Sequence, residues 1–285
     1  MSDLSRKIII SVAPAARHID EKAAVKGEAA QVVASVMTPE EIAGDVIACA
    51  KNGATLVHMH VRDAQGHLTD DIGEFSRTIR MIRSGCSVII EGSTGGVGEL
   101  NAEERSGALK DPQVDVACVN MGSVNLGEGV FANSLEEIRL WCAAVKKRRA
   151  VAILQCFEPG MIATVERMQK DGYIDDPKIY GIPMGFAGSQ PAAVANMQLL
   201  VGLLPKNAVW YYQQHGMEDL SMIAAAAAAG AKIVRVGFED SLFYAPGKRA
   251  SSNAELVARC ADVIRSIGYE PATYEEACRI IGLKR

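Results

Sequence analysis

The strongest constraint on the fold is a repeated pattern in which a short apolar run, rich in β-branched residues, precedes a longer amphipathic stretch. Because the apolar runs are almost uninterrupted, each one predicts a strand that is covered on both faces, as the strands of a parallel sheet are. The strands predicted in this way are Lys7–Ala13, Thr55–Val61, Ser87–Gly92, Val114–Asn120, Val151–Phe157, Ile179–Met184, Ala208–Gln213 and Lys232–Phe238.

Helix signals fall between these runs. Thr38 precedes Pro39-Glu40-Glu41, which predicts an N-cap, a proline in the first turn and a glutamate that completes a capping box. Gly53 predicts the end of that helix. The same capping logic recurs from Ser134 to Glu137. About eight alternations of strand and helix predict a (β/α)₈ TIM-type barrel, an α/β fold.

We expect one barrel domain over residues 1–285, with a long first βα loop at about 15–38 and helices at the C-terminal end. A barrel of this type takes about 250 residues as one unit. The alternative is an open Rossmann-like sheet. It is disfavoured because the first strand is followed by Ala-Pro-Ala-Ala-Arg (13–17), where a dinucleotide-binding fold would carry GxGxxG.

Charge and composition narrow the functional classes. The net charge is −4 and neither sign is clustered, which argues against a nucleic-acid partner. The alanine run Ala224–Ala229 is far shorter than the ~20 residues of a membrane span. The apolar run near the N-terminus is too short for a signal peptide. The seven cysteines include no CxxC pair, so we expect reduced thiols in a cytoplasmic protein.

The segment 56–63, Leu-Val-His-Met-His-Val-Arg-Asp, carries the first chemical signal. Alternate side chains of a strand share a face, so His58, His60 and Arg62 point the same way. Two imidazoles at the interior mouth of a barrel suit one metal ion, whereas unpaired they cost roughly 1–3 kcal/mol each. The alternative is that both histidines form hydrogen bonds with neighbouring residues.

The last predicted strand supplies the second signal. Arg235, Gly237 and Glu239 share one face, and the missing side chain of Gly237 predicts room for a ligand. A carboxylate at the mouth completes a set of two histidines and one glutamate. Asp240 has the opposite parity and, paired with Arg235, is a candidate base. The alternative for Arg235 and Glu239 is a structural ion pair inside the barrel.

Further polar clusters follow the third, fourth and fifth predicted strands. Ser93-Thr94-Gly95 can present hydroxyl groups and backbone N–H groups to an anion, although an ordinary βα turn has the same composition. Ser123 and Glu158 follow the next two strands. All of these residues fall at the C-terminal ends of strands, where the active sites of barrels lie.

Taken together, these motifs resemble the β-keto acid cleavage enzymes, a family that includes the 3-keto-5-aminohexanoate cleavage enzyme. The resemblance runs from about residue 8 to the C-terminus and is specific in the combination of HxHxRD with RxGxED. The motifs that carry it are His-Met-His-Val-Arg-Asp (58–63), Ser-Thr-Gly-Gly (93–96), Asn-x-Gly-Ser-x-Asn (120–125), Phe-Glu-Pro-Gly-Met (157–161) and Arg-Val-Gly-Phe-Glu-Asp (235–240).

The resemblance implies a zinc-dependent (β/α)₈ barrel, usually a homotetramer, that converts a β-keto acid and acetyl-CoA into acetoacetate and a new acyl-CoA. It implies that His58, His60 and Glu239 bind the zinc ion, although such a set also accepts cobalt or manganese. By the same resemblance, Arg235 and Asp240 form the dyad that removes a proton from C2 of the keto acid.

The resemblance also implies the residues that bind the substrate. Ser93, with Thr94 and Gly95 beside it, would anchor the carboxylate or the β-carbonyl group of the keto acid. Ser123 stands where the family commonly has a threonine, and Glu158 is a candidate for the pocket wall.

One departure from the family pattern bears on the substrate. An acidic residue of the aminohexanoate enzyme, which faces the amino group of its substrate, aligns near His18, whereas this chain has the basic pair Arg17-His18. We therefore expect Arg17 and His18 to contact a neutral or anionic β-keto acid rather than an amino-substituted one.

Two other functions remain open at this point. A metal-dependent hydrolase of the amidohydrolase kind also uses HxH on a barrel strand, but it needs histidines on later strands, and only His215 follows His67. A non-catalytic barrel that binds a metal or an acyl-CoA is the second alternative. The presence of both Arg235 and Asp240 disfavours it.

Overall fold

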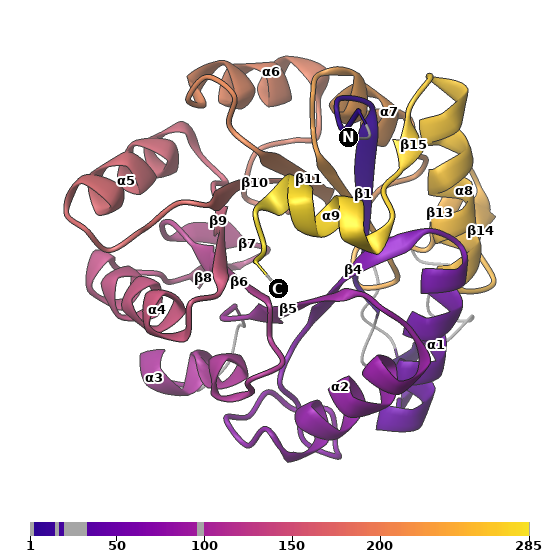
Figure 1. Cartoon of the computed structure of the whole chain (residues 1–285), viewed down its shortest axis with the longest axis horizontal. Helices are drawn as coiled ribbons and strands as arrows, with labels where there is room; N and C mark the ends of the chain where they lie inside the picture. The colour runs from indigo at the N-terminus through magenta and orange to yellow at the C-terminus, as the bar shows by residue number, and fades with distance from the viewer. Residues whose placement is uncertain (1–2, 15–16, 20–32, 96–99, 285) are drawn as a thin grey trace.

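The structure is a computed structural model that describes residues 3–14, 17–19, 33–95 and 100–284, with the backbone alone for 17–19 and 33–35. Eight parallel strands form a closed barrel (Figure 1), as the sequence predicted. The first and last strands close it in register, from Ile9 opposite Ile233 to Val12 opposite Val236. In spatial order the barrel strands are β1 (Lys7–Val12), β4 (Ala54–Met59), β5 (Ile89–Ser93), β6 (Val116–Asn120), β9 (Val151–Gln155), β10 (Lys178–Met184), β11 (Trp210–Gln214) and β12 (Ile233–Val236).

Helices surround the barrel (Figure 1), and in the described part of the chain none of them is long and apolar enough to cross a lipid bilayer. They are α1 (Pro39–Lys51), α2 (Gly73–Gly85), α3 (Ala102–Arg105), α4 (Leu135–Arg148), α5 (Pro159–Lys170), α6 (Val194–Leu203), α7 (Ser221–Ala228), α8 (Asn253–Ser266) and α9 (Tyr274–Ile281), with a 3₁₀ turn at Gly107–Lys110.

The predicted helix starts are present. At α1 the Thr38 hydroxyl accepts a hydrogen bond from the Glu41 amide, and the Glu41 carboxylate accepts one from the Thr38 amide. Ser134 and Glu137 form the same reciprocal pair at α4. Each capping box satisfies backbone N–H groups that the first turn of a helix leaves without partners.

The strand residues fall into two sets that alternate along each strand. One set, with Ile8, Ile10 and Val57 among its members, packs against the helices. The other set fills the barrel and forms a separate apolar cluster, with Ile9, Leu56 and Ile233 among its members. Towards the C-terminal ends of the strands, the inward positions change from apolar to polar: Ser11, His58, Glu91, Gln155, Gln213 and Arg235 are all buried.

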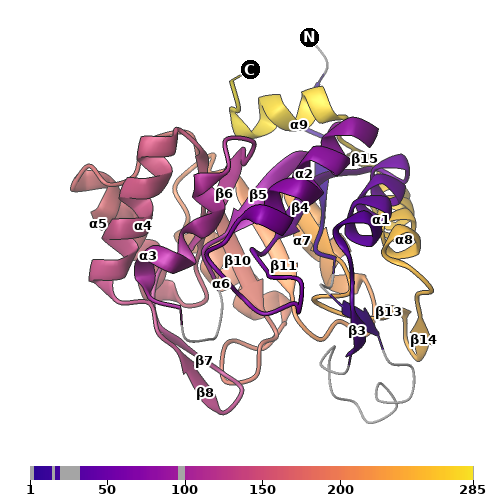
Figure 2. The same ribbon diagram turned by 90° about the horizontal axis from the view of Figure 1, so that it is seen from below.

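The C-terminal helix α9 covers one end of the barrel (Figure 2). Its Ala277, Cys278 and Ile281 belong to the apolar cluster that fills the interior. The short strand β15 (Glu270–Pro271), which precedes α9, pairs with β1. The polar inward positions therefore lie at the opposite end, which is the end where barrel enzymes carry their active sites.

Short antiparallel strand pairs extend from the polar end (Figure 2). They are β7 (Val124–Leu126) with β8 (Gly129–Phe131), β13 (Phe243–Ala245) with β14 (Lys248–Arg249), and β2 (Arg17–Ile19) with β3 (Val33–Val36). The last pair lies within the first βα loop, where the sequence analysis predicted no strands.

Candidate active site

The two histidines of the HxH motif lie at the polar end of β4. His58 is within the strand and only 4% exposed, whereas His60 follows the strand and is half-buried. Their Nε2 atoms are 3.2 Å apart. The alternation predicted from the sequence thus brings both imidazoles to one point of the barrel mouth.

Glu239, which follows β12, reaches the same point from the other end of the chain. Its Oε1 atom is 3.7 Å from Nε2 of His58 and 3.6 Å from Nε2 of His60. Zinc bonds of about 2.0–2.2 Å at tetrahedral angles separate neighbouring ligand atoms by about 3.3–3.6 Å. The donor atoms of His58, His60 and Glu239 therefore fit one tetrahedral divalent ion, and such a set leaves a coordination position for a further ligand.

The charge states of these groups agree with that fit. Burial lowers the pKa of His60, so its imidazole is neutral and keeps a lone pair. Burial alone would raise the pKa of Glu239, but its contacts with the His60 ring and with the charge of Arg235 outweigh burial and hold the pKa well below its usual range. A neutral imidazole and an ionised carboxylate are the forms that bind metal ions.

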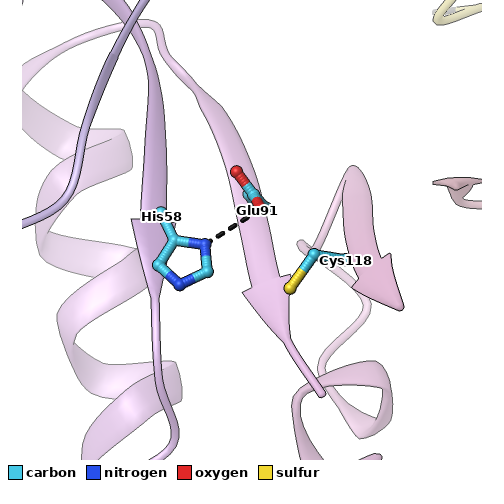
Figure 3. Close-up of side chains that lie close together, drawn as sticks. All are labelled: His58, Glu91 and Cys118. Atoms are coloured by element: carbon cyan, nitrogen blue, oxygen red, sulfur yellow. Dashed lines mark hydrogen bonds and ion pairs between the residues drawn. The ribbon is translucent and has the colours of Figure 1, made fainter. Parts of the chain in front are cut away.

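A second group of potential ligands consists of three buried side chains on the neighbouring strands β4, β5 and β6: His58, Glu91 and Cys118 (Figure 3). Nδ1 of His58 is 2.9 Å from Oε1 of Glu91. Burial raises the pKa of the Cys118 thiol to about 12, and this thiol donates a hydrogen bond to the Ser93 hydroxyl over 3.6 Å. The 2.9 Å contact between Nδ1 of His58 and Oε1 of Glu91 is a hydrogen-bond distance, shorter than the separation of about 3.3–3.6 Å between neighbouring ligand atoms of tetrahedral zinc, so this group fits a metal ion less well than His58, His60 and Glu239 do.

We therefore interpret Glu91 as a support for His58. If Nδ1–H donates to Glu91, the lone pair of His58 is on Nε2, the atom that faces His60 and Glu239. Glu91 is fully buried, and its Oε2 atom has no hydrogen-bond partner in the described part of the chain.

Glu91 was not among the predicted site residues, although its place in the sequence is unusual. A carboxylate inside an apolar strand needs an explanation, since an unpaired buried charge is costly. The partner of the Glu91 carboxylate is decided by the register of β4 and β5, which places His58 opposite Glu91.

The arginine and aspartate of the late motif form a buried ion pair. Nε of Arg235 donates to Oδ2 of Asp240 at 2.6 Å, and Nη2 donates to Oδ1 at 2.7 Å. Nη2 of Arg235 also lies 3.0 Å from Oε1 of Glu239. The structural ion pair considered for Arg235 and Glu239 is thus present, but it shares the Glu239 oxygen that faces both imidazoles.

Gly237 between them has a different role from the one expected. Its φ of +143° is a conformation that L side chains rarely adopt, and an added Cβ would lie 2.2 Å from the Ala13 carbonyl oxygen. Glycine is required here because β12 and β1 approach each other closely at the barrel closure. The expectation that it leaves room for a ligand is not supported.

The predicted anchors for the substrate differ in how their hydroxyl groups are used. The Ser93 hydroxyl accepts a hydrogen bond from the Gly95 amide at 3.0 Å. Together with His60 and Gly95, Ser93 lines a small cavity of about 20 Å³. Thr94 is fully buried, and its hydroxyl donates to the Cys118 carbonyl oxygen at 2.7 Å. The proton of Thr94 is thus already engaged within the barrel wall.

Four further residues were predicted to bind the substrate: Ser123, Glu158, Arg17 and His18. Ser123 is exposed, and its hydroxyl accepts from the Asn133 amide at 2.9 Å. Glu158 precedes α5 and accepts from the Gln190 side chain at 3.1 Å. The side chains of Arg17 and His18 lie outside the described residues, so their predicted contacts are not tested.

A cavity of about 320 Å³ opens beside the candidate metal ligands. His58, His60 and Glu239 form part of its wall. The rest of the wall comes from residues before and within the first turn of α1, from the chain after β4, and from α2. This volume is at the lower end of the range found for small-molecule sites.

A search against family models matches residues 22–283 to the beta-keto acid cleavage enzyme family. A 3-keto-5-aminohexanoate cleavage enzyme from Fusobacterium nucleatum is 33% identical over 87% of this chain and 90% of its own length. A 3,5-dioxohexanoate:acetyl-CoA acetone transferase from Paraburkholderia graminis is 27% identical over 87% of this chain and 89% of its own.

Among solved structures, ObcA in a ternary complex with a C4-CoA adduct and oxalate is similar, with a TM-score of 0.75 at 15% identity. The similarity covers 87% of this chain and 67% of that one, and at this identity it supports the barrel fold alone. The family match spans most of the chain and includes both halves of the site. The chain therefore belongs to the beta-keto acid cleavage enzyme family.

Proposed function

We propose that this protein is a zinc-dependent enzyme that condenses a β-keto acid with acetyl-CoA and releases acetoacetate and a new acyl-CoA. The observation that carries the proposal is the triangle of donor atoms from His58, His60 and Glu239 with the Arg235–Asp240 pair directly beside it. Relatives whose names specify a keto acid and acetyl-CoA support the choice of substrates.

His58, His60 and Glu239 would hold the metal, and two imidazoles with one carboxylate suit zinc, although cobalt or manganese can bind such a set. When bound, the metal supplies a Lewis acid that polarises a carbonyl oxygen of the substrate. Glu91 supports this arrangement because its carboxylate, 2.9 Å from Nδ1, fixes the orientation of the His58 ring.

Asp240 is our candidate for the base that takes a proton from C2 of the keto acid. Arg235 binds both oxygens of its carboxylate and is itself enclosed, since the side chains of Arg235 and Asp240 are 4% and 2% exposed. A carboxylate that is fixed in this way needs no reorientation before proton transfer, which favours catalysis.

The carbon chemistry then balances without a covalent link to the protein. C2 of the keto acid forms a bond with the acetyl carbonyl carbon, and CoA leaves as the thiolate. The thiolate adds to the original β-carbonyl carbon, and the bond from that carbon to C2 breaks. The products are the new acyl-CoA and, once C2 regains a proton, acetoacetate.

Ser93 is our candidate anchor for the carboxylate or β-carbonyl oxygen of the substrate. It is beside His60 in a small cavity, and its hydroxyl accepts from the Gly95 amide and from the Cys118 thiol. A hydroxyl that accepts two hydrogen bonds directs its own proton away from both donors. Thr94 and Gly95 would contribute through the backbone that shapes this loop, and Ser123 and Glu158 would lie at a greater distance.

We also carry over a homotetrameric assembly from the family resemblance, a cytoplasmic location from the cysteine pattern, and a preference for a neutral or anionic keto acid from Arg17-His18. A native mass measurement tests the assembly. The amidohydrolase alternative is weaker, because the ring of the one later histidine, His215, stacks on Phe186 with centroids 5.0 Å apart.

The test is incubation of the purified protein with acetyl-CoA and a panel of β-keto acids, with product analysis for acetoacetate and the new acyl-CoA. We expect both products in equal amounts, with loss of activity in a chelator and recovery on addition of zinc. Products that form without acetyl-CoA, or a rate that is unchanged after the metal is removed, would contradict the proposal.

A further inference from the structure

We propose that the cavity beside the metal ligands holds the acyl tail of the keto acid, and that its wall selects tails that are apolar and uncharged. This inference rests on the proposed function and narrows its neutral or anionic keto acids to those with an uncharged tail. The cavity of about 320 Å³ is continuous with the wall formed by His58, His60 and Glu239, so a keto acid bound there would extend its tail into it.

Part of the wall is apolar. Met59 comes from the end of β4, Phe75 from α2 and Ile42 from α1. Met59 and Phe75 are buried, and both pack within the apolar layer between the barrel and its helices. Apolar surface of this kind stabilises a bound hydrocarbon by removing it from water.

The charged side chains that α1 and α2 bring to the wall bind one another. Arg77 of α2 forms ion pairs with Glu40 of α1 and with Glu74 of its own helix. Arg77 is thus shared between two carboxylates, which leaves this part of the wall with an excess of one negative charge. A carboxylate at the end of the tail would meet two carboxylates and one engaged guanidinium, and an ammonium group would compete with Arg77 for the half-exposed glutamates, whose ion pairs with a ligand contribute little.

The other polar groups of the wall are bonded in the same local way. The Thr78 hydroxyl donates to the Glu74 carbonyl oxygen at 2.8 Å. Asp63 accepts from the backbone amides of Gln65 and His67, both at 2.9 Å. Nη1 of Arg62 donates to the Gly66 carbonyl oxygen at 2.8 Å.

A wall of apolar side chains and already bonded polar groups favours the tail of the keto acid, rather than the pantetheine arm of CoA, as the occupant of the cavity. The arm contains amide groups that lose hydrogen bonds to water when they are buried, and a wall whose polar groups are engaged replaces few of them. An alkyl tail has no such requirement. The substrates named for two relatives differ in this tail: one carries a 5-amino group and the other a 5-oxo group.

The first experiment measures kcat/KM with acetyl-CoA for straight-chain 3-oxo acids of increasing length. Analogues of equal length that end in an ammonium or a carboxylate group complete the panel. We expect kcat/KM to rise roughly fourfold for each added methylene until the cavity is full, and each charged analogue to be slower than its uncharged counterpart. A flat series, or a charged analogue that reacts faster than its counterpart, would overturn the inference.

The second experiment changes the wall. Thr78→Leu enlarges a buried wall residue of α2, and Ile42→Phe does so from the half-buried opposite side on α1. We expect each variant to lower the ratio of kcat/KM for the longest acid over the shortest by roughly tenfold, because a crowded pocket discriminates by about this factor for each methylene.

Thr164→Leu is the matched control. Thr164 of α5 makes the same bond as Thr78, from its hydroxyl to the carbonyl oxygen of the residue four positions earlier, but it does not line the cavity. In Thr164→Leu, the ratio of kcat/KM for the longest acid over the shortest should equal that of the unmodified protein. An equal loss for all acids in both wall variants would overturn the inference and leave the proposed function intact. An unmodified protein that converts no β-keto acid would contradict both.

Discussion

His58 and His60 are two residues apart in the chain and point to the same site, yet their surroundings differ. His58 is buried in the barrel, and Glu91 binds the far side of its ring. His60 is half-buried beside the cavity, and among the described residues its contacts with neighbouring polar atoms use Nε2 alone.

The difference shows how one site can hold its catalytic groups rigidly while the residues that select the substrate remain free to vary. On the His58 side, the hydrogen bond to the Glu91 carboxylate and those within the Arg235–Asp240 pair fix these side chains in the barrel interior. On the His60 side, the cavity wall comes from helices and loops, whose side chains can change without disturbing the barrel. We expect substitutions on the first side to alter catalysis or metal binding, and those on the second to alter the choice of substrate.

The largest expected effect comes from the residue that both sides share. Glu239→Ala removes the carboxylate that faces both imidazoles, so we expect bound metal and activity to be lost together, with a rate lower by roughly a thousandfold or more. Metal analysis of the purified variant and a product assay test this. Full metal occupancy in the variant would show that the ion lies elsewhere.

Asp240→Asn separates catalysis from metal binding. The amide keeps the size of the side chain but cannot accept a proton as a base, so we expect kcat to fall by about 10²–10⁴ while the metal remains. Because the change leaves the buried Arg235 without its carboxylate partner, the melting temperature must be measured as well. Loss of metal from a folded variant would contradict the assignment of Asp240 as the base.

Glu91→Ala tests the difference between the histidines directly. We expect metal affinity to fall by about 10–100-fold, as it does when the support of a metal-binding histidine is removed. Glu91→Gln keeps an oxygen that can accept from Nδ1, so it should recover most of that affinity. Competition with a chelator gives the affinities, and the visible spectrum of the cobalt-substituted protein reports the geometry. Equal affinity in both variants would show that Glu91 has no such role.

The smallest expected effects distinguish the two neighbouring hydroxyl groups. Ser93→Ala should lower kcat/KM by roughly tenfold, as expected when a hydrogen bond to a charged group is lost. Thr94→Val should change kcat/KM less but lower the free energy of unfolding by about 1 kcal/mol, because its hydroxyl binds the Cys118 carbonyl. The opposite order of effects on kcat/KM would assign Thr94 as the anchor.

Much of the fold follows from the sequence, because an apolar strand covered on both faces and a capped amphipathic helix are local patterns. Thr38 and Ser134 mark helix starts that the structure reproduces. The alternation of side chains also predicted one shared face for His58 and His60 and another for Arg235 and Glu239, whereas the meeting of the two segments at one metal site was implied by the family resemblance.

The rest depends on contacts between strands and helices that local patterns do not encode. The register that sets His58 opposite Glu91 decides which carboxylate supports the metal site. Similarly, Gly237 must be a glycine because Ala13, which follows the first barrel strand, lies against it. The cavity needs the relative placement of α1 and α2, which single-strand periodicity cannot supply.

Helix α9 covers one end of the barrel with Ala277, Cys278 and Ile281, and apolar side chains fill the interior next to it. In the described part of the chain, the polar end is therefore the entrance to the site. Under the proposed reaction, both substrates and both products would have to pass through that entrance. The bulky CoA carrier would then obstruct exchange of the smaller acid whenever it is bound. We therefore expect steady-state kinetics in which the keto acid binds before acetyl-CoA, with the acyl-CoA product competing against its own precursor.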